Sequence, residues 1–214
     1  IANTQQMMHL LALNTDRQHM EQLVDAMDET AFRSTLQELT QQSQKFLEAT
    51  ALASDEAYQS MLEQSLRVFT RRVGELLDAE RASLFLVDRE RQELVLRVAQ
   101  DMPEGEYVRI PLASGIAGAA AMAGVVVRVD DAYADPRFNQ AIDAETGFHT
   151  RSMLCLPLQD RSGAVFAVTQ LLNRRDGRPF DEQDTHRYAE LASSLSVLLE
   201  SLVKLGRTAA RRAP

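Results

Sequence analysis

The chain contains a single cysteine, Cys155, and this scarcity excludes several classes of protein. One cysteine cannot form an intramolecular disulfide, which is typical of a reducing compartment, so we expect a cytoplasmic location. The four histidines, His9, His19, His149 and His186, show no metal-ligand spacing. With only one cysteine beside them they do not indicate a zinc or iron–sulfur site, and no metal is expected.

Long apolar runs and an excess of positive charge are also missing. No hydrophobic stretch reaches the roughly 18 residues that a membrane-spanning helix needs, and no basic flank followed by an apolar block marks a signal peptide. The 31 acidic residues outnumber the 23 basic ones, for a net charge of −8. Such a surface repels phosphate backbones and anionic lipids, so neither nucleic acid nor a membrane is expected as a partner.

Glycine and proline are absent from the first part of the chain, where Gly74 and Pro103 are the first of each. This composition predicts helices, and residues 1–53 are expected to form a helical or coiled-coil segment. Thr15 and Ser54 are suitable N-caps. Apolar residues recur at heptad-like spacing in one run of Met20, Val24, Met27 and Ala31 and in a shifted run of Leu36, Leu39, Phe46 and Ala53.

The hydrophobic period changes near Arg81 from that of helices to that of strands. Strands are expected over residues 83–87, 93–99, 107–112, 125–129, 153–158 and 164–173, with a short helix over 114–123. Only one helix interrupts the strands, which favours an α+β fold with an antiparallel sheet and helices packed on it.

A long C-terminal helix is expected from about Asp181 to Leu205, followed by a disordered tail over 206–214. Its apolar stripe consists of Tyr188, Leu191, Leu195, Leu198, Leu202 and Leu205. The distal part of this stripe and the run of Met20, Val24 and Met27 are best buried by a second copy of the chain. We therefore expect a parallel homodimer through the terminal helices; the alternative is an intramolecular bundle.

Two groups of residues are candidates for ligand binding. Gly115, Ile116, Ala117 and Gly118 begin the short helix, where free amides and the helix dipole favour an anion. Small residues there also allow a helix to lie flat on a sheet. Asp143, Thr146 and Thr150 lie in a loop and are typical either of groups that orient a polar ligand or of caps and turns. Cys155, in an apolar run, is expected to be a small buried hydrophobe.

The sequence motifs resemble the cyclic-nucleotide-binding GAF domains of phosphodiesterases and bacterial adenylate cyclases over residues 82–201. The motifs are Gly-Ile-Ala-Gly at 115, Asp-Ala-Tyr at 131, Thr-Gly-Phe-His-Thr at 146, Leu-Cys-Leu-Pro at 154 and Gln-Leu-Leu-Asn at 170. The resemblance implies a GAF-like six-stranded antiparallel sheet, with a GAF domain including its flanking helices over 54–205. It also implies ligand-binding roles for Ser83, Arg97, Ala99, Ile116, Ala117, Asn139, Asp143, Thr146, Thr150 and Gln170.

The same resemblance implies a structural ion pair, in which Arg174 takes the place of the family's lysine and Asp184 keeps the carboxylate. The second strand departs from the family, since Arg97, Val98 and Ala99 stand where some members place an aromatic ring against the purine. Cyclase-type domains are similar in this respect, which favours cyclic AMP over cyclic GMP.

The function implied is that of a regulatory sensor domain and not of an enzyme. It would bind a cyclic nucleotide, need no cofactor, and pass the signal through helices to an output domain outside this chain. Because the chain begins at Ile1 rather than at a methionine, we expect it to be part of a longer protein. The alternative is a GAF-fold scaffold that only dimerises and binds no ligand.

Overall fold

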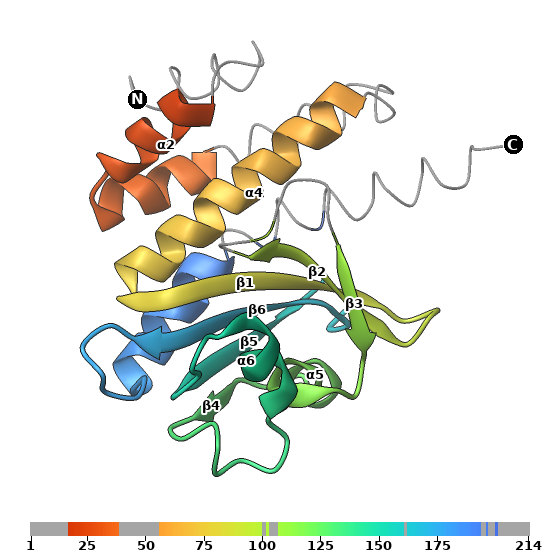
Figure 1. Cartoon of the computed structure of the whole chain (residues 1–214). Coiled ribbons are helices and arrows are strands. Elements are labelled where there is room, and N and C mark those ends of the chain that lie inside the picture. Colours follow the sequence, from red (N-terminus) through yellow and green to blue (C-terminus); the bar gives the residue numbers. More distant parts are fainter. Residues whose placement is uncertain are drawn as a thin grey trace, which may run out of the picture. The chain divides into compact units, whose positions relative to one another are not determined.

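A computed structural model describes residues 17–38, 56–99, 102, 107–160, 162–193, 196 and 200 of the chain (Figure 1). The chain divides into two compact units, residues 1–72 with 193–214 and residues 73–192. Several predicted features lie outside the described residues, namely the caps Thr15 and Ser54, the apolar positions Leu39, Phe46, Ala53, Leu195, Leu198, Leu202 and Leu205, and the tail over 206–214.

The first unit is helical in its described part. It contains α2 (Arg17–Asp25), a helix over 29–38 and most of α4 (Glu56–Leu76). The heptad-like run from Met20 to Ala31 does not lie on a single helix, because the chain leaves the helix after Asp25. Asp28 starts the next helix by accepting a hydrogen bond from the amide of Ala31 at 2.8 Å, as an N-cap does.

Apolar residues of these helices are covered within one chain. Val24 and Met27 are buried, and the rings of Phe32 and Phe69 pack edge to face with their centroids 5.8 Å apart. The guanidinium of Arg71 pairs with Asp25 at 2.7 Å. Val24 and Met27 therefore need no second copy of the chain to bury them, contrary to the sequence-based expectation. None of the described helices combines the length and the apolar character needed to cross a bilayer.

The second unit is built on a six-stranded antiparallel sheet. The strands are β1 (Ala79–Asp88), β2 (Glu93–Ala99), β3 (Val108–Pro111), β4 (Val127–Val129), β5 (Met153–Gln159) and β6 (Val165–Arg174). Their order is β3-β2-β1-β6-β5-β4. The predicted α+β fold is confirmed, although β1 begins at Ala79, earlier than expected.

The two faces of the sheet carry different partners. On β6, Val168 and Leu172 face the core cluster that includes α5 (Gly115–Ala123), whereas Thr169 makes a hydrogen bond with the buried Tyr188. Tyr188 belongs to a helix described from 182 to 193. Because neighbouring strand residues point to opposite faces, α5 and the C-terminal helix cover opposite faces of the sheet.

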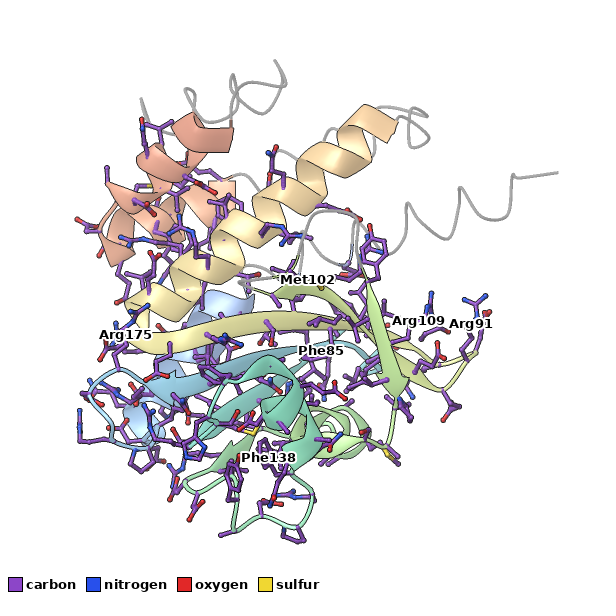
Figure 2. All side chains as sticks on the ribbon, viewed as in Figure 1. Phe85, Arg91, Met102, Arg109, Phe138 and Arg175 are labelled. Atoms are coloured by element: carbon purple, nitrogen blue, oxygen red, sulfur yellow. The ribbon has the colours of Figure 1, made fainter. Side chains whose placement is uncertain are left out.

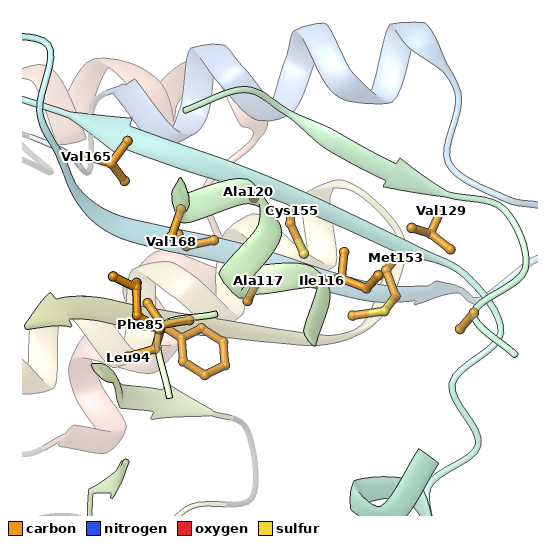
Figure 3. Close-up of a cluster of buried hydrophobic side chains, with 13 residues drawn as sticks. Phe85, Leu94, Ile116, Ala117, Ala120, Val129, Met153, Cys155, Val165 and Val168 are labelled. Atoms are coloured by element: carbon orange, nitrogen blue, oxygen red, sulfur yellow. The ribbon is translucent and has the colours of Figure 1, made fainter. Parts of the chain in front are cut away.

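The core beneath α5 is made of small and branched side chains. Figure 3 shows Ile116, Ala117 and Ala120 of α5 close to Met153 and Cys155 of β5, all of them buried. A helix whose inner face is mainly alanine approaches a sheet closely. The alternative interpretation of the small residues, that they let the helix lie flat, therefore holds for the body of α5.

Replacing Gly118 with alanine is expected to lower the free energy of unfolding by about 1–3 kcal/mol, because the added methyl group would overpack the core there. An added Cβ would collide with the carbonyl group of Leu112 and with the backbone of Ala113. Urea unfolding measures the loss, with Met122→Ala as the control, since Met122 lies on the same helix and is 67% exposed. Equal stability of Gly118→Ala and the unchanged protein would contradict this close packing.

Candidate functional site

A cavity of about 120 Å³ lies between the sheet, the first turn of α5 and the segment that contains α6 (Gln140–Thr146). In Figure 2, Phe85 marks the sheet side of this cavity and Phe138 the side of the segment before α6. The residues that line it are Arg81, Phe85, Ile110, Ser114, Gly115, Ile116, Ala117, Phe138, Asn139, Ile142, Asp143, Thr146, Phe148, Thr150, Met153, Gln170 and Leu172.

Most of the predicted ligand-binding residues meet at this cavity. They are Ile116, Ala117, Asn139, Asp143, Thr146, Thr150 and Gln170. They come from α5, from α6 and its flanks, and from β6, which are far apart in the sequence but adjacent around the sheet. The fold thus brings together polar groups that the motifs alone only list in order. Their binding of a ligand stays a prediction.

The positive end of α5 faces into the cavity. Ser114 is the N-cap residue, with extended backbone and no hydrogen bond from its side chain to the helix. Gly115, with a φ of 69°, and Ile116 follow it along the lining. The amide groups of a first helical turn have no partner within the helix and carry the positive end of its dipole. This side of the cavity therefore favours a negatively charged group.

Asp143 connects α6 to the loop before β5. One of its oxygens accepts hydrogen bonds from the Thr150 amide at 2.6 Å and the Tyr133 hydroxyl at 3.2 Å, and the other accepts from the Thr150 hydroxyl at 2.8 Å. Both Asp143 and Thr150 are buried. Burial and the Asp143 carboxylate together raise the pKa of Tyr133. The carboxylate thus holds the wall of the cavity in place, and a direct contact with a ligand stays a prediction.

Two predicted residues make the local hydrogen bonds of caps and turns. Asn139 accepts from the amide of Ala141 at 3.2 Å and so caps α6. The hydroxyl of Thr146 donates to the carbonyl of Ile142 at 2.8 Å. Both side chains still line the cavity. The alternative interpretation of these residue types as caps and turns therefore holds, and the same caps and turns form part of the wall of the cavity.

Arg81 and Phe148 are lining residues that the sequence interpretation missed. The Arg81 guanidinium lies over the Phe148 ring, 4.0 Å from its centroid, in a cation–π contact. Among the lining residues Arg81 carries the one positive charge and Asp143 the one negative charge. A signal was present for both, since Phe148 belongs to the motif at 146, and Arg81 precedes Ser83 by two positions and shares its strand face.

Three predicted residues do not line this cavity. Ser83 is buried opposite Ala99 and Gln170 in the sheet. Arg97 stands at an irregularity in the β1–β2 register, and its guanidinium lies 4.1 Å from the centre of the Tyr107 ring. Burial lowers the pKa of Arg97. A role of these residues near the purine base of a bound nucleotide stays a prediction.

The predicted ion pair joins the end of β6 to the start of the C-terminal helix. A nitrogen of the Arg174 guanidinium lies 2.5 and 2.6 Å from the two carboxylate oxygens of Asp184. The Asp184 side chain is 5% exposed and that of Arg174 is 13% exposed, so the pair is largely desolvated. Within the described residues there is no cluster of side chains suited to hold a metal ion.

Comparison with known sequences identifies relatives of this chain. The GAF domain family model matches residues 61–199. The chain is 39% identical over 127 residues to the dual 3',5'-cyclic-AMP and -GMP phosphodiesterase 11 of Drosophila melanogaster, a match that covers 52% of this chain and 9% of that protein. It is 36% identical over 151 residues to phosphodiesterase 11A of Takifugu rubripes, covering 65% of this chain and 16% of that protein.

Solved structures share the fold at low sequence identity. The GAF domain of the Acinetobacter phosphoenolpyruvate-protein phosphotransferase superimposes with a TM-score of 0.58 at 18% identity, over 85% of this chain and 99% of that one. The free methionine-R-sulfoxide reductase from Neisseria meningitidis gives a TM-score of 0.57 at 24% identity, over 84% and 95%. With the family match over more than half of its length, the chain belongs to the GAF domain family.

Proposed function

We propose that this chain is a regulatory sensor domain that binds a cyclic nucleotide and passes the signal through its helices to an output domain outside the chain. The observation that carries the proposal is the cavity itself, where the first turn of α5 and the Arg81 guanidinium line the same space. A cyclic phosphodiester has a single negative charge, which suits a helix N-terminus together with one arginine. No catalytic step is assigned to this chain.

The matches with phosphodiesterases support the class of ligand. The names of the Drosophila and Takifugu relatives state activity on both cyclic AMP and cyclic GMP. The chain spans only a small part of those proteins, so their catalytic activity is not carried over. We favour cyclic AMP as the ligand because β2 has Arg97, Val98 and Ala99 where some family members place an aromatic ring.

The size of the cavity favours a second candidate function, a GAF-fold scaffold that binds no ligand. About 120 Å³ is less than the roughly 300–1,000 Å³ typical of small-molecule sites. Binding of a nucleotide therefore requires the lining to move outward. Phe138 and Phe148 lie in irregular backbone on either side of α6, and displacement of this segment would enlarge the space.

Calorimetry with cyclic AMP, cyclic GMP and uncharged adenosine distinguishes the two functions. The sensor is expected to bind at least one cyclic nucleotide, and ligand at 100 times its dissociation constant should add about 2.7 kcal/mol to the free energy of unfolding. Arg81→Gln should weaken binding of the cyclic nucleotides more than that of adenosine, which lacks the phosphate. Absence of heat and of thermal stabilisation with both nucleotides would support the scaffold.

Thr150→Ala is expected to weaken cyclic-nucleotide binding by about 1 kcal/mol or more, the contribution of one buried hydrogen bond. The substitution removes the donor to Asp143 that is 2.8 Å away and so loosens the loop against α6. Thr150→Ser keeps the hydroxyl and serves as the control in calorimetry. Asp143→Ala should weaken binding as well, without unfolding the domain. Unchanged affinity in both alanine variants would reject the assignment of this wall to the site.

We also propose that the chain forms a parallel homodimer through its C-terminal helix, which would let a change at the sheet alter the register of the two helices that lead to the output domain. The sequence pattern of Leu198, Leu202 and Leu205 supports this proposal. Light scattering at micromolar concentration tests it, with Leu198→Glu combined with Leu202→Glu as the variant that should dissociate the dimer. A monomeric mass of the unchanged chain would reject the dimer.

A further inference from the structure

The buried thiol of Cys155 contacts a polar residue of the candidate site. Cys155 on β5 and Gln170 on β6 are directly paired in the sheet, and the Cys155 Sγ donates to the Oε1 of Gln170 at 3.4 Å. Cys155 is 0% exposed, whereas Gln170 lines the cavity. The thiol therefore lies beside the carboxamide on the same face of the sheet, covered from solvent, while the carboxamide borders the cavity.

The sulfur acts as a donor because its proton is retained. Burial raises the pKa of Cys155, and the positive charge of Arg137 opposes this shift only in part. A protonated thiol is a weak hydrogen-bond donor, and a carboxamide oxygen is its natural acceptor. A charged thiolate in this place would instead repel that oxygen.

The contact determines which end of the carboxamide is available to a ligand. A carboxamide has an oxygen that accepts and a nitrogen that donates two hydrogen bonds. The oxygen of Gln170 is engaged by Cys155, and in the described part of the chain its Nε2 has no acceptor within hydrogen-bond distance. A ligand that covers this amide nitrogen and excludes water from it must supply an acceptor, since leaving the nitrogen unpaired would then be costly.

We propose that Cys155 is a positioning residue, which fixes the Gln170 carboxamide so that its NH₂ group faces the cavity and selects a ligand with a hydrogen-bond acceptor at that point. The protein half of this inference is the fixed orientation of the Gln170 carboxamide. The ligand half is the selection of a ligand with an acceptor, and it rests on the proposed function. Adenine has the acceptor N1 on the edge where guanine carries an N1–H donor. A carboxamide that can only donate there favours cyclic AMP, because a donor facing a donor leaves both unpaired.

Infrared spectroscopy tests the protein half without any ligand. The chain has one cysteine, so its S–H stretching band belongs to Cys155 alone. Gln170→Leu should move this band to higher frequency, because the acceptor is lost, and Gln170→Glu should keep it low. Gln159→Leu is the matched control, since Gln159 is a β5 amide that donates to the Gly124 carbonyl instead. An unchanged band in Gln170→Leu overturns the inference.

Calorimetry with cyclic AMP and cyclic GMP tests the ligand half. Cys155→Ala frees the carboxamide to turn and to accept as well as donate, so the preference for cyclic AMP should shrink by about threefold to tenfold. Cys155→Ser keeps a donor and should restore most of that preference. An equal ratio in Cys155→Ala and the unchanged protein, with an altered ratio in Gln170→Ala, overturns the positioning role but leaves the proposed function intact. Binding of neither nucleotide by the unchanged protein overturns the proposed function and the ligand half, while the infrared result still decides the thiol contact.

Discussion

Replacing Asn173 with alanine is expected to lower the free energy of unfolding by about 3 kcal/mol or more and to abolish cyclic-nucleotide binding. The Asn173 side chain is fully buried and accepts hydrogen bonds from the amides of Arg151 at 2.6 Å and Ser152 at 3.2 Å. It donates to Glu80 and to the carbonyl of His149, both at 2.9 Å. Each lost buried hydrogen bond costs about 1 kcal/mol, and more where the partner stays unpaired.

The effect on binding follows from what Asn173 holds. Its partners flank Thr150, so the same side chain that closes the end of β6 also places Thr150 against Asp143. Chemical unfolding and calorimetry measure the two losses. Asn173→Gly is the control for backbone strain, because the φ of Asn173 is 51° and glycine adopts this value freely. If Asn173→Gly is as stable as the unchanged protein, strain and not hydrogen bonding explains the alanine variant.

Asp184→Ala is expected to lower the free energy of unfolding by about 3–5 kcal/mol, because it leaves the largely buried guanidinium of Arg174 without its main partner. Asp184 also accepts from the amide of Asp181 at 3.0 Å, while Asp181 accepts from the amide of Asp184 at 2.9 Å. This reciprocal pair is a capping box in which an aspartate stands in the place of the usual glutamate or glutamine. The substitution thus removes an ion pair and half of a helix cap.

Asp181→Ala is the matched control, since it removes only a cap and should cost about 1 kcal/mol. Combining Asp184→Leu with Arg174→Leu should recover part of the loss, because neither charge is then left alone in a dry place. Arg174 keeps a contact with Asp176 at 3.1 Å, which places the expected loss toward the lower end of the range. A larger loss in Asp181→Ala than in Asp184→Ala would mean that the ion pair does not stabilise the fold.

The strands were predictable because their signal is local. Alternation of apolar and polar residues from Arg81 onward indicates half-buried strands. The glycines at 124 and 163 mark the end of α5 and the turn between β5 and β6. The N-terminal helices were less predictable. Heptad-like spacing continues through Met27, yet Asp28 provides a cap and the chain turns there. Apolar spacing alone cannot tell one long helix from two short ones that bury the same residues.

The site was predictable only in part, because several of its residues make contacts that their motif positions do not suggest. Thr150 and Asp143 were identified as polar groups of a loop, but no sequence pattern shows that they bind each other. Arg81 was missed because its place on the same strand face as Ser83 is the one signal for it in the sequence, and its contact with Phe148 forms only in the folded domain. Arg97 was selected, yet it lies on Tyr107 and not on the cavity.

The sequence by itself determined the order of strands and helices along the chain, the excess of acidic residues, and the family motifs. Periodicity, charge and short motifs are properties of residues that are close together in the sequence. Only the tertiary structure decided which of those residues share a cavity and which polar atoms there are already paired. Cys155 and Gln170 lie 15 positions apart and become partners because the consecutive strands β5 and β6 pair in that register. The register depends on the turn between the strands and on which face is buried, and a shift by one residue would turn the two side chains to opposite faces.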